Sequence, residues 1–328
     1  MTTTMTTPAE APRRNRRAKP KQPKRAKPTQ PPQPQQAARP QRTAPVRPPS
    51  SADTAAAVLS SAFTMIAIVC LWMAAQMLFL GGVSQGRAQD LLYKEFRTEL
   101  AGATAPIGPI VPVGDPVALL TIPDIGLEQV VVEGTASGDT LVGPGHRRDT
   151  PLPGQAGTSV VYGRATTYGG PFKDLLDLHV GDTFQVTGAQ GKKTFTVVGL
   201  RQAGDPLPQP LADGAARLTL VTAKGSGRFG AITPDAVVYV DADAKKAFPA
   251  PPGRPLVVPE SEKAMAADRG ALPLLALCLA LLLALTLGVV AARQRWSTVL
   301  VWVIASPLVI ALSWVTTDVV MRLLPNLI

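Results

Sequence analysis

Few side chains in this sequence could act as a nucleophile or as a general base. Ser226 lies between two glycines and Thr222 lies in an apolar run. Either hydroxyl would attack a carbonyl carbon only with a base within hydrogen-bond reach. His146 is the plausible base, because His179 occupies a turn-flanking position typical of a solvated surface residue. One hypothesis is therefore acyl transfer by a hydroxyl and a histidine. The alternative is that the Gly-Ser-Gly around Ser226 is ordinary loop sequence.

The two cysteines, Cys70 and Cys278, offer no thiol chemistry outside a membrane, because each lies inside a long apolar run. The two histidines are far apart, and without thiolates beside them they match no zinc-ligand spacing. We therefore predict neither a metal nor a cofactor. A calcium site stays open as an alternative, among aspartates spread over turns: Asp139, Asp149, Asp174, Asp177 and Asp182.

Positive charge is concentrated at the beginning of the chain. Residues 1–52 hold twelve of the 33 Lys and Arg residues and one of the 23 acidic residues, while the whole chain carries +10. Residues 1–53 are rich in Pro and Gln and cannot bury enough apolar surface to offset the entropy of ordering, so we predict a disordered tail. Beside a membrane span, such a tail is cytoplasmic and binds anionic lipid headgroups. It lacks the interleaved aromatic residues that stack on bases, so we predict no nucleic-acid partner.

Three apolar runs are long enough to cross a bilayer as helices, which takes about 20 residues. Basic residues mark the cytoplasmic flanks of such runs, so the chain is predicted to begin in the cytoplasm, with residues 84–269 extracellular. Arg293 and Arg295 then lie inside again, residues 325–328 lie outside, and the protein is a multi-pass plasma-membrane protein. A cleaved signal peptide is the competing interpretation of the first run, which is too long and too far from Met1 for that role. The runs are 54–83, 270–292 and 296–317.

Between the first and second runs the pattern changes to short strands. Residues 84–116 predict a juxtamembrane helix, with Leu92 and Phe96 on one face, followed by a linker. Residues 117–242 contain strand-like runs separated by Gly, Pro and Asp turns, which indicates a mainly β fold, a small barrel or sandwich. Residues 243–269 are a Pro-rich, then charged, linker. The predicted strands are 117–122, 128–132, 158–162, 183–187, 194–200, 217–222 and 236–240.

Several motifs of this region resemble, in the same order, those of the sortase family. Val160–Phe172 is similar to the stretch around the family's catalytic histidine, and Arg217–Ala223 is similar to the strand that delivers its catalytic cysteine. The resemblance covers 117–242, is closest to the actinobacterial housekeeping type called class E, and implies a sortase β-barrel. The other matching segments are Ile122–Leu127, Gly143–His146, Thr150–Gln155 and Leu178–Asp182.

The resemblance also implies a mechanism, whose three residues are replaced here. In sortases a His–Cys pair attacks a threonyl or alanyl peptide bond in a sorting signal, and an Arg steadies the developing oxyanion. Arg164 takes the place of the histidine, Ala223 that of the cysteine and Pro234 that of the arginine. Arg228 lies nearby, but in the loop. The resemblance thus implies a degenerate copy that lacks the catalytic residues.

We therefore predict a catalytically inactive, membrane-anchored sortase-like protein that binds an extended peptide or a surface-protein partner at the cell envelope. Two alternatives stay open. One is an active transpeptidase or peptidase in which Ser226 and His146 substitute for the lost pair. The other is a scaffold that binds another membrane protein through the helix pair of 270–317. The predicted groove residues are His146, Arg164, Thr166, Tyr168, Thr222 and Arg228.

Overall fold

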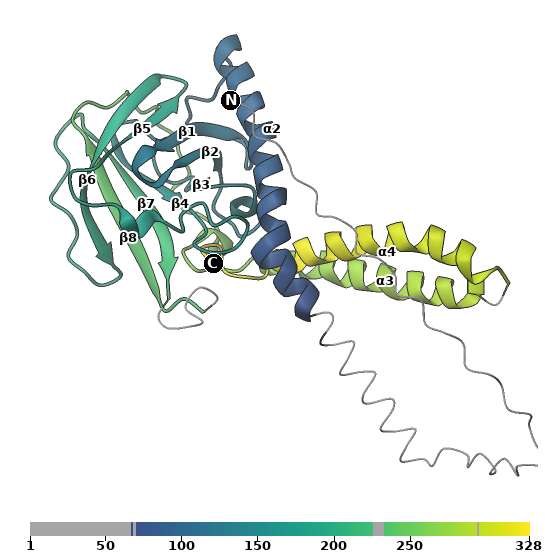
Figure 1. The fold of residues 1–328 in the computed structure, drawn as a ribbon. Coiled ribbons are helices and arrows are strands. Elements are labelled where there is room, and N and C mark those ends of the chain that lie inside the picture. Colours follow the sequence, from purple (N-terminus) through teal and green to yellow (C-terminus); the bar gives the residue numbers. More distant parts are fainter. Residues whose placement is uncertain (1–66, 68–69, 226–232, 294) are drawn as a thin grey trace, which may run out of the picture. The chain divides into compact units, whose positions relative to one another are not determined.

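A computed structural model describes residues 67, 70–225, 233–293 and 295–328. The predicted disordered tail and half of the first predicted membrane run lie outside these residues, as do Ser226 and Arg228. The described part contains a long helix, a β-barrel and a pair of apolar helices, in this order along the chain (Figure 1).

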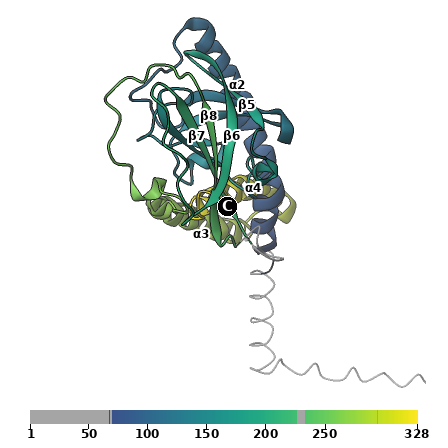
Figure 2. The ribbon, with the colours of Figure 1, turned by 90° about the vertical axis from the view of Figure 1, so that its left-hand side faces the viewer.

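The strands close into a barrel, which decides between the two predicted β architectures. Their order around the barrel is β1-β2-β3-β4-β7-β8-β6-β5, antiparallel except for the parallel pairs β2 with β3 and β4 with β7. Figure 2 shows β6, β7 and β8 side by side. β3 was not predicted, because a strand of two residues is too short to show alternation. The strands among the described residues are β1 (Pro116–Ile122), β2 (Leu127–Glu133), β3 (Gly145–His146), β4 (Gly157–Tyr162), β5 (Thr183–Gly188), β6 (Gly191–Gln202), β7 (Ala216–Lys224) and β8 (Ala236–Ala244).

β7 is the strand that crosses the middle of the fold, and it is buried on both faces from Ala216 to Ala223. Side chains alternate along a strand, so Leu218 and Leu220 point into the barrel core, where they pack with Val161 and other apolar residues. The opposite face of β7 is also covered; there Val221 and Ala223 are apolar, whereas Arg217 and Thr219 are polar and donate to carboxylates of β8.

A continuous helix precedes the barrel. It runs from Cys70 through a π-helical turn, η1 (Gln76–Leu80), into α2 (Gly81–Gly102), so the predicted juxtamembrane helix is one part of a longer element. Gln89 attaches α2 to the barrel: its amide donates to the carbonyl of Val130 (3.1 Å) and accepts from the N–H of the same residue (2.7 Å).

Two apolar helices, α3 (Leu272–Arg293) and α4 (Thr298–Met321), follow the barrel and pack side by side (Figure 1). Most of their large apolar side chains are exposed. Within the described part of the chain, these two helices are long and apolar enough to cross a membrane, over Arg269–Val289 and Val299–Met321. The chain then turns back, and in both views its marked C end lies at the barrel (Figures 1 and 2).

Candidate functional site

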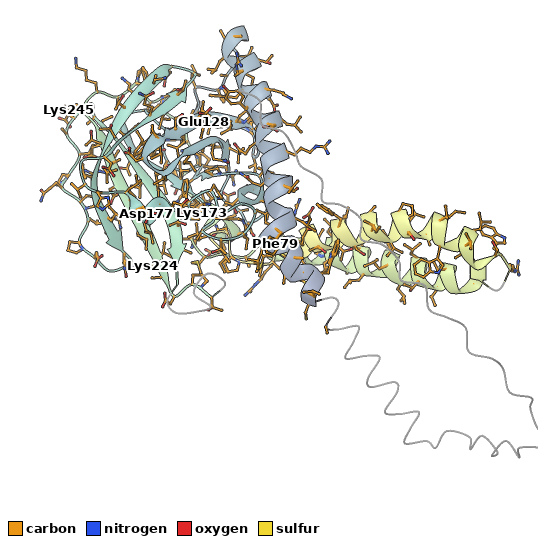
Figure 3. The ribbon with its side chains drawn as sticks, viewed as in Figure 1. Phe79, Glu128, Lys173, Asp177, Lys224 and Lys245 are labelled. Carbon is orange, nitrogen blue, oxygen red and sulfur yellow. The ribbon has the colours of Figure 1, made fainter. Side chains whose placement is uncertain are left out.

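The site predicted at the end of β7 is covered by the residues that follow α4. We call Pro325–Ile328 the closing segment. Val221 and Ala223 lie on the outer face of β7, and fully buried Leu327 packs against both of them. The methyl group of Ala223 is no nucleophile, and the closing segment excludes water from it. Figure 3 shows the neighbouring Lys224 at the end of the strand, where its side chain is exposed.

The closing segment is a turn, in which the N–H of Ile328 donates to the carbonyl of Pro325 (3.3 Å), and its main chain is also hydrogen-bonded to the barrel. The N–H of Ala165, three residues after β4, donates to the carbonyl of Leu327 (2.9 Å). The side chain of Leu327 also contacts Tyr162, the last residue of β4. The closing segment therefore combines a main-chain hydrogen bond to one strand end with a buried side chain over β4 and β7.

Asn326 holds the opposite edge of the closing segment. Its N–H donates to the carbonyl of Ala266 (3.0 Å). Its side-chain amide donates to the carbonyls of Thr135 (2.6 Å) and Lys263 (2.9 Å). The closing segment thus lies between the strand end on one side and the chain around 263–266 on the other.

Arg164 is the largest fully buried side chain in the described part. An arginine carries five N–H donors, and each finds an acceptor here. Nε donates to Thr140 Oγ1 (3.2 Å), and Nη2 donates to the hydroxyl (2.8 Å) and carbonyl (2.9 Å) of Ser137. Nη1 donates to Thr167 Oγ1 (2.9 Å) and to the main-chain oxygen of Ile328 (3.1 Å). Burial lowers the pKa of Arg164 to about 10, so the side chain is still charged at neutral pH.

The three hydroxyls that accept hydrogen bonds from Arg164 each donate a hydrogen bond to a main-chain oxygen at or after the end of α4. A hydroxyl can accept a hydrogen bond and donate one at the same time. Arg164 therefore holds this stretch both directly and through three bridging side chains. The onward bonds run from Ser137 Oγ to the carbonyl of Met321 (3.3 Å), from Thr140 Oγ1 to the carbonyl of Asn326 (3.0 Å) and from Thr167 Oγ1 to the main-chain oxygen of Ile328.

His146, the predicted substitute base, is buried and has both ring nitrogens engaged. Nδ1 lies 2.7 Å from a carboxylate oxygen of Glu133, and Nε2 lies 2.9 Å from the carbonyl of Pro151 and 3.1 Å from Thr150 Oγ1. β3, which carries His146, is separated from β7 by β4. The ring therefore tethers loops on its own side of the barrel and presents no nitrogen to a hydroxyl of β7.

Two other predicted groove residues, Thr222 and Tyr168, are hydrogen-bonded to partners away from Ala223. Thr222 lies on the opposite face of β7 and donates to the carbonyl of Gly163 (3.1 Å). Tyr168 adopts left-handed backbone (φ 50°), and its hydroxyl donates to Asp318 of α4 (2.7 Å). Burial, and then this hydrogen bond, raises the pKa of Tyr168. Thr166 is half-buried in the same loop.

Pro234 is half-buried and lies two residues before β8. The N–H of the next residue, Asp235, donates to the carbonyl of Lys224 (3.1 Å), which closes the base of the β7–β8 loop. Ser226 and Arg228 belong to the part of this loop that lies outside the described residues. Their predicted roles stay predictions.

Sequence reasoning missed the residues that surround Arg164. Ser137 and Thr140 read as turn residues, which is their commonest role. Asn326 and Leu327 follow a predicted membrane helix and carry no motif. The one signal was an isolated polar residue, Asn326, within an otherwise apolar end, and a buried amide requires hydrogen-bond partners elsewhere in the fold.

Comparison with known proteins confirms the resemblance to sortases for the barrel. Residues 120–239, from within β1 to within β8, match the family model described as "Sortase domain". Among solved structures, a Clostridium perfringens sortase D5 transpeptidase is 21% identical, with a TM-score of 0.40, covering 48% of this chain and 98% of that one. The SrtA sortase of Actinomyces oris is 26% identical, with a TM-score of 0.36, covering 42% and 84%. The SrtF sortase of Corynebacterium diphtheriae is 21% identical, with a TM-score of 0.36, covering 48% and 100%. Comparison with curated proteins gave no match.

Proposed function

We propose that this chain is a membrane-anchored sortase-domain protein that binds an extended peptide at the cell envelope without cleaving it. A sortase-type reaction needs a thiolate and a base close to it. The corresponding position carries Ala223, and the position of the base carries Arg164, whose five N–H groups are all engaged. His146 has both nitrogens engaged as well. These three side chains support a binding role.

The closing segment is the observation that carries the proposal. It lies over the outer face of β4 and β7, receives a main-chain hydrogen bond from Ala165 and buries Leu327 against the two strands. A bound peptide is likewise held by main-chain hydrogen bonds together with side chains that enter pockets. This face therefore has the chemistry to hold a peptide of similar sequence.

Contacts between the helices support the predicted membrane anchoring. Trp72 donates from its indole to Thr317 (3.0 Å), and Gln76 donates to Asp318 (3.4 Å), so the helix before the barrel is hydrogen-bonded to α4. Polar contacts of this kind join helices inside a bilayer. The N–H of Asp268 also donates to the carbonyl of Arg322 (3.0 Å), which keeps the two ends of the α3–α4 hairpin together. The barrel and the closing segment then lie on one side of the membrane, as the three-span topology requires.

Crosslinking in intact cells that carry the full chain tests the proposal. We expect a partner from the envelope to be recovered with the protein only when crosslinker is added, and the protein itself to keep its unmodified mass. Cells without the chain are the control. A covalent acyl adduct formed without crosslinker, on Ser226 or Thr222, would show instead that the domain is an active transpeptidase.

A further inference from the structure

The closing segment contacts the rest of the protein through main-chain hydrogen bonds and through the buried side chains of Asn326 and Leu327. Asn326 is fully buried, and its amide donates to two carbonyls, those of Thr135 and Lys263. Leu327 is fully buried in an apolar pocket, in one cluster with Tyr162, Val221 and Ala223. An amide followed by a branched aliphatic side chain is therefore what this site recognises, because a shorter or charged residue in second place would leave the pocket empty or bury a charge.

The fit is incomplete in one place, which favours exchange. Among the described residues, no group donates to Oδ1 of Asn326, although this oxygen is buried. A buried acceptor without a donor disfavours the bound state. Removal of the closing segment would return this oxygen to water.

We infer that the closing segment is an exchangeable intramolecular ligand, which occupies the peptide site until an external peptide with an Asn-Leu pair displaces it. The inference rests on the proposed function for its external ligand, but the occupancy itself does not. A tethered segment acts at an effective concentration on the order of millimolar. An external peptide therefore competes poorly with it unless a partner also pulls α4 or the segment away.

Exposure of position 223 to a thiol reagent tests the occupancy. The full chain would carry Ala223→Cys in a background with Cys70→Ser and Cys278→Ala, and labelling would be followed in detergent micelles. With the closing segment intact we expect slow labelling, and with residues 325–328 deleted we expect labelling faster by at least about tenfold, because Leu327 no longer covers the site. Leu327→Gly keeps the rest of the closing segment, and labelling in this variant should also be faster than in the intact chain. It serves as a control in case the deleted chain misfolds.

Lys224→Cys, made in the same background, is the matched reference. Its side chain is exposed at the next position of β7, so its labelling rate should be equal with and without the closing segment. Equal labelling of Ala223→Cys in the intact, Leu327→Gly and deleted chains would overturn the inference. A parallel rise at both positions would also overturn it, because it would indicate general loosening of the strand.

A peptide added in trans tests the recognition. An acetylated Pro-Asn-Leu-Ile peptide at millimolar concentration should slow the labelling of Ala223→Cys in the deleted chain, whereas Pro-Asn-Asp-Ile should not. Equal effects of the two peptides, or no effect of either, would overturn the assigned specificity. These readouts need no cellular partner and no catalysis. A failed crosslinking experiment would therefore refute the proposed function and leave the occupancy to be decided by labelling.

Discussion

Arg164 and Arg217 are both buried arginines, but Arg217 is paired with a carboxylate, whereas Arg164 donates to uncharged hydroxyl groups and to main-chain oxygens. Arg217, on β7, donates from Nε and Nη2 to the two carboxylate oxygens of Asp243 (2.6 and 2.7 Å), which lies directly opposite on β8. This hydrogen-bonded pair raises the pKa of Arg217. The pKa of Arg164 is lowered by burial, and its acceptors are hydroxyl and main-chain oxygens.

The difference shows what each arginine holds together. The pair of Arg217 and Asp243 joins neighbouring strands whose register already places the two residues side by side. Arg164 instead donates to Thr140, which is 24 positions away in the sequence, and to Ile328, which is 164 positions away. Removal of Arg217 therefore weakens the pairing of β7 with β8, whereas removal of Arg164 should release the closing segment.

The largest effect is expected for Arg164→Met. This substitution keeps most of the volume but leaves several buried oxygens without a donor, so we expect the free energy of unfolding to fall by about 3 kcal/mol. Thermal unfolding in detergent would measure this fall, and labelling of Ala223→Cys in the same variant should accelerate. Full retention of stability together with slow labelling would show that Arg164 is not what holds the closing segment.

The same substitution at the second arginine, Arg217→Met, sharpens the comparison. Water reaches the half-exposed Asp243 that it leaves behind, so the expected loss is about 1 kcal/mol, and the labelling of Ala223→Cys should not change. Unfolding curves of the two Arg→Met variants, recorded side by side, give the ranking. A greater loss at Arg217 than at Arg164 would reverse our assignment of the two roles.

Thr140→Val tests one bridging hydroxyl. It removes the acceptor for Arg164 and the donor to Asn326 with little change in shape, and a loss of about 1 kcal/mol is expected. Thr219→Val is the matched control, since Thr219 Oγ1 donates to Asp241 of the neighbouring strand β8 (2.6 Å) and takes no part in the hydrogen bonds of Arg164. Both variants should lose stability in a thermal scan, but only Thr140→Val should expose position 223. Exposure in both would argue against a specific bridge.

The smallest effect concerns Asp139, which lies in the turn that contains Ser137 and Thr140. Burial raises its pKa to about 6. Between about pH 4 and pH 6 the folded chain holds this proton while the unfolded chain has lost it, so stability falls as pH rises through this window. Asp139→Asn should therefore be more stable than the parent at pH 7 and equally stable near pH 4. Thermal scans at both pH values check this, and a difference that grows toward pH 4 would contradict it.

The sequence predicts the barrel better than it predicts the site. Seven strands were found because alternation and turn residues are local signals, and β3 was missed because two residues carry none. Tyr168 was assigned to the groove from its place in a motif. Its left-handed backbone directs it to Asp318 of α4, a contact 150 residues away in the sequence. The role of Leu327 was missed for the same reason, since contacts across the whole chain leave no trace in local pattern.

Hydrogen exchange at two neighbouring amides tests the central claim most directly. The N–H of Ala165 donates to Leu327 in the closing segment, whereas the N–H of Gly163 donates to Val221 within the barrel (both 2.9 Å). In the full chain both amides should be protected. With residues 325–328 deleted, we predict that Ala165 loses its protection while Gly163 keeps it. Protection of Ala165 that persists in the deleted chain would contradict the claim that the closing segment occupies the peptide site.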